Sequence, residues 1–287
     1  MEWVNIIFQG VLLGGLYALF AAGLSLIFGV MRLVNIAHGD LIVAFAYMAY
    51  FVMAALHIGP FTSLAVIVPA AALIGYGLQR GLLNWTLGEE LPPLLVTIGL
   101  SVIIQNLLLV FFTFDTHRLH AGDIEIASVQ FLPDLSVGVL PLIQFAVAVA
   151  IIAGLQIVFY RTALGRAFRA TSDDPVVAQL MGLETRHIFA MAMALSLAVV
   201  AVAGVFIAIR TDFNPFYGPQ LLIFGFEAII IGGLGSLWGT LAGGILLGIA
   251  QALGGQFNVG WPFLAGHVVF LAVLIVRPQG LFPKVAL

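Results

Sequence analysis

Long apolar runs divide this chain, and short polar stretches separate them. A bilayer core takes about 20 apolar residues per helix, so a run of that length predicts one span. The stretch 221–256 is apolar but rich in glycine, which leaves open two short spans or one re-entrant pair. The pattern predicts an all-α fold, a polytopic integral membrane helix bundle with broken or re-entrant glycine-rich helices, in a single domain over residues 1–287. The other qualifying runs lie near residues 5–31, 41–58, 61–80, 93–113, 139–160, 188–209 and 263–277.

The composition agrees with this prediction. Hydrophobic residues make up 62% of the chain and charged residues only 8%, whereas soluble domains usually contain about 25% charged residues. The chain has no cysteine, which excludes disulfides and thiolate metal sites. Its net charge of −3 is too small to indicate a nucleic-acid partner. The N-terminus lacks a basic segment and leads into a run too long for a signal peptide, so we expect the first run to be a retained helix.

The arginines and the single lysine predict the orientation, because cytoplasmic loops carry an excess of both. With the N-terminus outside and the C-terminus in the cytoplasm, the outer side keeps Arg118 and Arg210. An odd number of crossings follows, seven or nine depending on the stretch 221–256. The cytoplasmic side then receives Arg32, Arg80, Arg161, Arg166, Arg169, Arg186, Arg277 and Lys284.

Two loops are long enough to carry structure of their own. The outer loop, 114–138, includes Asp123-Ile124-Glu125-Ile126, whose alternation predicts a short strand or hairpin. This loop is either a contact for an extracytoplasmic protein or a solvated connection. The inner loop, 161–187, reads RTALGRAFRATSDDPVVAQLMGLETRH and contains stronger signals.

The inner loop contains a predicted helix start and a predicted helix end. Asp173 and Asp174 precede Pro175, and an aspartate followed by proline is typical of a helix N-terminus. Gly182 is a suitable residue just after the helix. The loop therefore predicts one or two short helices across the cytoplasmic surface.

The apolar residues of this short helix need a surface to pack against, because so short a helix is marginal alone in water. They are Val176, Val177, Leu180 and Met181. The headgroup region and a docked subunit are both candidates. The acidic residues nearby oppose attraction to an anionic membrane surface, which favours a docked subunit.

Small residues recur every fourth position in two parts of the chain, and such faces let membrane helices approach closely. These clusters lie next to the few polar residues within the predicted membrane spans. Glycine-rich membrane helices can also be interrupted around a substrate path. Close packing is nevertheless the main role that we expect of them. The positions are Gly10, Gly14, Ala18 and Ala22, then Gly235, Gly239 and Gly243, and finally Gly232, Ser236, Thr240, Gly244 and Gly248.

Few polar residues interrupt the apolar runs. Glu227 is ionisable, and such a group near the middle of a membrane usually faces a cavity or a partner. It would need no such role if 221–256 is re-entrant and places it near the outer interface. Gln105 and Asn106 are uncharged, so we expect hydrogen bonds between helices from them.

The stretch LVNIAHGDLI, residues 33–42, is the densest polar cluster between two runs. As a simple turn, Gly39 would permit a sharp bend and Asp40 would cap the next helix and pair with Arg32. Asn35 and His38 are not required by that interpretation. We therefore predict a pathway or gating element from Asn35, His38, Gly39 and Asp40, with Glu227 as a further member, and a polar turn remains the alternative.

Three segments resemble a known family. GLYALFAAGLSLIFGVMRLVNIAHGDL (15–41), ALGRAFRATSDDPVVAQLMGL (163–183) and GGLGSLWGTLAGGILLG (232–248) are similar, in this order, to segments of permeases from bacterial branched-chain amino-acid ABC importers. The similarity is greatest to the smaller of their two permease types, that of the high-affinity leucine/isoleucine/valine system.

The resemblance implies a permease subunit without chemistry of its own, in the bacterial inner membrane. Its implied partners are a second permease subunit, two cytoplasmic ABC ATPase subunits that bind ATP-Mg, and a periplasmic solute-binding protein, besides membrane lipid. This chain itself would hold no cofactor and no metal. The inner loop would be the coupling element. Together, the loop and the resemblance predict ATPase coupling by Arg166, Asp173, Asp174, Pro175, Val177, Ala178, Met181 and Gly182.

Other functions remain as alternatives. A related importer could carry urea, amides or carboxylic acids, and a stand-alone secondary transporter could use Glu227 as an ion site. A membrane enzyme is disfavoured, because no two histidines have the i, i+4 spacing of helical zinc motifs. No Walker A sequence occurs either, so ATP hydrolysis is expected on another chain.

Overall fold

The computed structural model describes residues 2–88, 91–132 and 135–282. Seven of its helices are long and apolar enough to cross a membrane. They are α1 (Glu2–Met31), α2 (His38–Leu56), α3 (Pro60–Gly81), α4 (Leu91–Phe112), α6 (Val139–Arg161), α9 (Thr185–Arg210) and α11 (Leu237–Phe257). Two shorter apolar helices, α10 (Gly218–Gly232) and α12 (Trp261–Val276), complete the apolar part of the described chain. The helical membrane bundle predicted from the sequence is confirmed.

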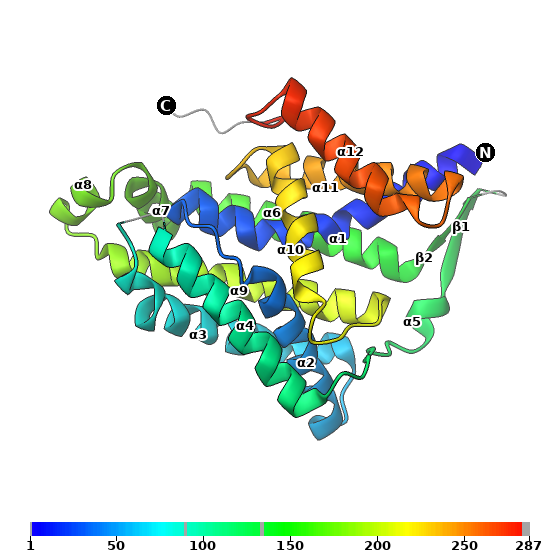
Figure 1. Ribbon diagram of the computed structural model, residues 1–287, viewed down its shortest axis with the longest axis horizontal. Coiled ribbons are helices and arrows are strands. Elements are labelled where there is room, and N and C mark those ends of the chain that lie inside the picture. The colour runs from blue at the N-terminus through cyan, green and yellow to red at the C-terminus, as the bar shows by residue number, and fades with distance from the viewer. Residues whose placement is uncertain (1, 89–90, 133–134, 283–287) are drawn as a thin grey trace.

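The centre of the bundle is formed by α1 and α9. Within their most apolar windows, 83% of α1 and 78% of α9 is buried, against 11% of α4 and 22% of α3. In Figure 1, α1, α6, α9 and α11 run roughly parallel, and α10 crosses α1 at a steep angle. The stretch 221–256 thus forms one short helix of 15 residues and one full-length helix of 21 residues.

Glycines permit the close approach of α1 and α11. A methyl group added at Gly14 would lie 2.4 Å from the Cα of Ile245, and one added at Gly248 would lie 2.3 Å from the carbonyl oxygen of Gly10. The predicted packing role of these small residues is confirmed. Gly243 plays the same part against α10, 2.1 Å from the carbonyl oxygen of Ala228.

The two ends of the bundle differ. One end carries α5 (Asp123–Ile126) and a hairpin of β1 (Ser128–Leu132) and β2 (Leu135–Gly138), close to the start of α1 (Figure 1). The other end carries α7 (Ala163–Asp173) and α8 (Pro175–Leu180) (Figure 1). The short helix η1 (Leu83–Trp85) lies at this same end. The side-chain amide of Asn84 donates a hydrogen bond of 3.2 Å to the carbonyl oxygen of Arg186, in the first turn of α9. Lys284 and Asp134 lie outside the described residues.

The outer loop corrects one prediction. Residues 123–126 form a helical turn, in which the Ala127 amide donates to the carbonyl oxygen of Asp123 over 2.9 Å, and the hairpin follows at 128–138. Glu125 also accepts a hydrogen bond from the amide of Ala121, which stabilises the turn. Four alternating residues were too few to distinguish a strand from a turn held by a side chain.

Candidate functional site

The chain folds back into the bundle after α1. Arg32 has a positive φ of 52°, and the next residues lead to His38, whose Nε2 lies 2.9 Å from the carbonyl oxygen of Phe20. Phe20 precedes the end of α1 at Met31 by roughly 16 Å of helix axis, at about 1.5 Å per residue. As a result, α2 begins inside the bundle rather than at its surface.

Asn35 shapes this return segment. Its Oδ1 accepts a hydrogen bond from the amide of Ala37 at 3.0 Å, and its carbonyl oxygen accepts one from the amide of His38 at 3.3 Å. Asn35 was not expected to take part in a simple turn, and that prediction was wrong. An asparagine that hydrogen-bonds two residues along the chain is a common way to build such a turn.

Asp40 is held by α4 and not by Arg32. Its carboxylate accepts hydrogen bonds from the hydroxyl of Ser101 at 2.6 Å and from the side-chain amide of Gln105 at 3.0 Å. The predicted pair with Arg32 is wrong, because the return segment carries Asp40 into the interior and leaves Arg32 exposed. The predicted cap is also wrong, since Asp40 lies within the first turn of α2 and the start of α2 has no side-chain cap.

Gly39 provides close contact instead of a bend. A methyl group there would lie 2.0 Å from the carbonyl oxygen of Gly218, the first residue of α10, and one on Gly218 would lie 2.1 Å from an Asp40 oxygen. The first turns of α2 and α10 therefore touch. Helix N-termini carry partial positive charge, so both favour the carboxylate of Asp40 between them.

A polar stripe on α4 completes this junction. Thr97 accepts a hydrogen bond from the amide of Ile36 at 3.3 Å, and Ser101 and Gln105 continue the same face toward Asp40. The expected interhelical bond of Gln105 is confirmed, whereas Asn106 bonds within its own helix to the carbonyl oxygen of Val102. This stripe was not predicted from the sequence, although the spacing of four residues was a usable signal.

The four residues of the return segment that were predicted to line the pathway pack against neighbouring helices in this conformation. Asn35, His38, Gly39 and Asp40 are all buried, and together with Thr97, Ser101 and Gln105 they form what we call the interior junction. Their side chains fill the contact between α1, α2, α4 and α10. A pathway role stays a prediction, and it requires these helices to separate.

Glu227 lies apart from the interior junction. It is buried on α10, and its carboxyl group is in hydrogen-bond contact with the Nδ1 of His267 on α12, whose side chain is 43% exposed. The contact with His267 was not predicted from the sequence. Within the described residues, no three histidine, aspartate or glutamate side chains are grouped as a metal site requires.

The inner loop folds as two helices anchored to the bundle. Thr162 caps α7 by accepting from the amide of Gly165 at 3.1 Å, and Phe168 is fully buried against Phe159, with ring centroids 5.4 Å apart. Ser172 donates to the carbonyl oxygen of Gly29 at 2.8 Å and so ties α7 to the end of α1. Arg166 is exposed on α7.

The predicted start and end of α8 are confirmed. Asp174 accepts from the amides of Val176 at 2.8 Å and Val177 at 3.0 Å, and Pro175 occupies the first turn. Gly182 ends the helix with a positive φ of 87°.

One side of α8 faces the bundle and the other faces outward. Ala178 is buried, and the side-chain amide of Gln179 donates a hydrogen bond to the hydroxyl of Thr185 at 2.6 Å. The outward residues form what we call the α8 apolar face, and this face has no cover within the described chain. Its members are Val176, Val177, Leu180 and Met181, which are 67%, 52%, 81% and 79% exposed.

Comparison with known proteins identifies the family. The family described as branched-chain amino acid transport system, permease component, matches residues 6–277. The chain belongs to this family. It is thus a multi-pass membrane permease component, and its relatives are transport permeases and not enzymes.

Individual relatives match over nearly the whole chain. The high-affinity branched-chain amino acid transport system permease protein BraD of Pseudomonas aeruginosa is 27% identical, over 96% of this chain and 94% of the relative. LivH of Escherichia coli, a permease protein of the same description, is also 27% identical over the same shares. LivM of Escherichia coli is 32% identical over 43% of this chain but only 29% of its own length. No solved structure matches this chain.

Proposed function

We propose that this chain is a permease subunit of an ATP-driven importer for branched-chain or closely related amino acids. The family match over residues 6–277 is the observation that carries the proposal. The names of BraD and LivH, which this chain matches over 94% of their length, favour branched-chain amino acids over urea, amides or carboxylic acids as the solute.

The proposed assembly contains a second permease subunit, two cytoplasmic ATPase subunits that bind ATP-Mg, and a periplasmic solute-binding protein. The partial similarity to LivM supports a pair of related permeases. The orientation that we propose has the N-terminus outside and the C-terminus in the cytoplasm. It is supported by the clustering of Arg32, Arg161, Arg169 and Arg186 at the end that carries α7 and α8.

The α8 apolar face is the proposed contact for an ATPase subunit. Exposed large apolar groups on a short helix gain stability when a partner covers them, at about 25 cal/mol per Å² of apolar area. The hydrogen bond from Ser172 to Gly29 and the packing of Phe168 on Phe159 hold α7 to the bundle, and α8 follows α7 directly. A displacement of α8 would therefore be passed to the end of α1 through Ser172 and Gly29. Coupling would follow from this connection.

The interior junction is the proposed place where the pathway opens. Broken membrane helices whose N-termini meet inside a bundle are the usual setting of a transporter site, because those N-termini attract anionic groups. Here α2 and α10 begin beside each other, and an amino-acid carboxylate could be received there once Asp40 and its partners separate.

The test is purification of the tagged chain from its native membranes in mild detergent, with every stoichiometric partner identified by mass spectrometry. Two ATPase chains and a second permease support the proposal. The assembly is then placed in vesicles with the binding protein from the same cells, and uptake of radiolabelled leucine, urea and short amides is compared. A chain that purifies alone and moves a solute without ATP would contradict the proposal and favour a secondary transporter built around Glu227.

A further inference from the structure

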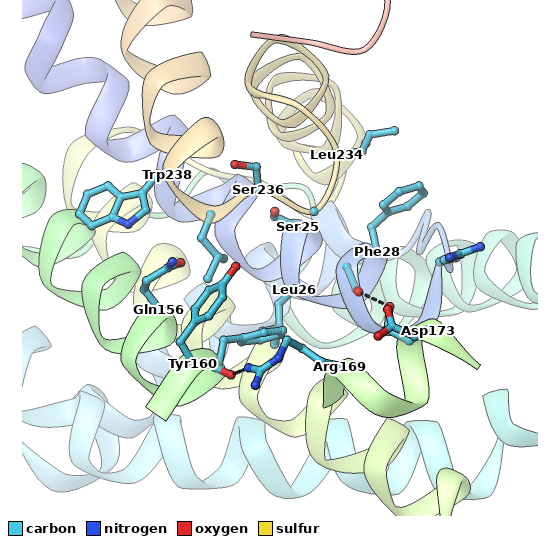
Figure 2. Close-up of a pocket in the computed structure, with 16 residues that line it drawn as sticks. Ser25, Leu26, Phe28, Gln156, Tyr160, Arg169, Asp173, Leu234, Ser236 and Trp238 are labelled. Atoms are coloured by element: carbon cyan, nitrogen blue, oxygen red, sulfur yellow. Dashed lines mark hydrogen bonds between the residues drawn. The ribbon is translucent and has the colours of Figure 1, made fainter. Parts of the chain in front are cut away.

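A cavity of about 950 Å³ lies at the end of the bundle that carries α7. It is bounded by the end of α1, the end of α6, the side of α7 and the turn from α10 to α11 (Figure 2). Pockets that hold small molecules measure roughly 300–1,000 Å³, so the space is sufficient for a polar headgroup. This cavity is separate from the interior junction and from the α8 apolar face.

The cavity lining mixes apolar and polar side chains and carries a net positive charge. Arg32 and Arg169 line it, and Asp173 is its one acidic residue. Neither arginine forms an ion pair within the described chain. Arg169 donates to the carbonyl oxygen of Phe159, which uses one of five N–H groups and leaves others for a ligand.

A buried hydroxyl lacks a partner at the same place. Ser25 is 1% exposed and lines the cavity, and its Oγ makes no hydrogen bond within the described chain. A buried polar group left unpaired costs about 1–3 kcal/mol, so an acceptor atom of a ligand that reached this hydroxyl would offset that cost. Ser236, the residue that caps the start of α11, lines the same cavity (Figure 2).

The start of α11 adds a second source of positive potential. Ser236 accepts from the amide of Gly239 at 3.1 Å, so the first turn of α11 lies at the cavity. Helix N-termini favour phosphate and other anions. The helix start, the two arginines and the unpaired hydroxyl all favour one kind of ligand, an anion with several acceptor oxygens.

Aromatic residues at the rim indicate where that anion comes from. Tyr160 and Trp238 line the cavity and are 59% and 47% exposed. Both lie at helix ends, as tyrosine and tryptophan do at the headgroup level of a membrane. Arg169 stacks over the ring of Tyr160 at 5.3 Å. A rim of this kind places the cavity beside lipid headgroups, and basic pockets between membrane helices bind anionic headgroups.

We propose that this cavity binds the phosphate group of an anionic phospholipid, with Arg32, Arg169 and the hydroxyl of Ser25 as its ligands. The bound headgroup bridges the end of α1 to α7, beside the hydrogen bond between Ser172 and Gly29. An anionic lipid would thereby stabilise the position of α7, on which α8 is mounted. This inference does not depend on which solute the protein carries.

The test is a lipid titration of the full assembly in mild detergent, read by native mass spectrometry. The probes are phosphatidylglycerol, phosphatidylethanolamine and inorganic phosphate. Wild-type protein is expected to retain phosphatidylglycerol about tenfold more tightly than phosphatidylethanolamine. Arg32→Gln is expected to weaken retention by about tenfold, the value of one charge-assisted hydrogen bond, and Arg32→Lys should keep most of it.

Two further variants make the test specific. Ser25→Ala, which removes the unpaired hydroxyl without adding volume, is expected to weaken retention several-fold. Arg161→Gln is the matched control, because Arg161 is exposed at the same end of the bundle but does not line the cavity. It should leave retention unchanged, and size-exclusion profiles establish that each variant is folded.

Several outcomes would overturn the proposal. Equal retention of the two lipids would exclude an anion site, and equal loss in Arg161→Gln would indicate diffuse attraction to basic residues. Retention of phosphatidylglycerol unchanged by both Arg32→Gln and Ser25→Ala would place the lipid elsewhere. If millimolar inorganic phosphate displaced the lipid and was itself retained, the occupant would be free phosphate, and if leucine did so, the cavity would belong to the solute path.

Discussion

The interior junction and the α8 apolar face have opposite chemical characters. The junction collects polar side chains in the core of a membrane protein; all but the half-buried Gln105 are buried, and most are hydrogen-bonded. The α8 apolar face presents apolar side chains at the end of the bundle, and nothing in the described chain covers them. Polar groups with partners hold one conformation, whereas apolar groups without partners call for a second molecule. The comparison separates what stabilises this subunit from what connects it to others.

The largest effect is expected from filling the contact between α2 and α10. Gly39→Leu introduces side-chain atoms where even a methyl group would lie 2.0 Å from the carbonyl oxygen of Gly218. Overpacking of this kind costs about 1–3 kcal/mol or more, and we expect loss of uptake together with loss of a monodisperse protein. Gly77→Leu is the control, because a methyl group at Gly77 meets nothing within 4 Å. If Gly77→Leu lost uptake and monodispersity to the same extent as Gly39→Leu, the close contact at the interior junction would not be what the fold depends on.

Substitutions on the α8 apolar face should lower uptake without impairing the folding of the subunit. Met181→Asp places a charge on a side chain that is 79% exposed, so the subunit itself should insert and purify normally. Uptake should fall by at least tenfold if a partner must cover this position, because a buried unpaired charge costs several kcal/mol. Ile126→Asp, 84% exposed at the opposite end of the bundle, is the matched control. Uptake at the wild-type level in Met181→Asp would refute the docking role.

Individual hydrogen bonds of the junction should have intermediate effects. Asn35→Ala removes the acceptor of the Ala37 amide, and His38→Ala removes the contact with the Phe20 carbonyl oxygen. Each is expected to lower stability by about 1–3 kcal/mol and to change uptake, while the ATPase subunits still co-purify. Thermal unfolding and co-purification separate these effects. Loss of the assembly in these variants, with the ATPase subunits no longer co-purifying, would instead support a purely structural turn.

The smallest effect is expected from a surface ion pair next to α8. Glu184 pairs with Arg80 over 2.8 Å, but both side chains are largely exposed. Exposed pairs contribute little to stability, so Glu184→Gln should leave uptake within about twofold of wild type. A loss as large as that of Met181→Asp would show that charge, and not the α8 apolar face, mediates docking.

Much of the fold followed from the sequence, because helix length and apolar runs are set by the bilayer. The ends of α8 were also predictable, since Asp174, Pro175 and Gly182 act on the backbone next to them. The partners of Asp40 were not, because a reversal of the chain after Arg32 decides them, and residues close in sequence then lie far apart. Long-range pairs such as Glu227 with His267 leave no local signal at all.

The most direct test of the account uses the absence of cysteine from the chain. A single cysteine in place of Met181 can carry a short photo-crosslinker in the intact assembly, with a cysteine in place of Ile126 as the control at the other end. The account predicts a crosslink from Met181→Cys to an ATPase subunit and none from Ile126→Cys. A crosslink from Met181→Cys to lipid alone would contradict it, and the α8 apolar face would then be a membrane anchor.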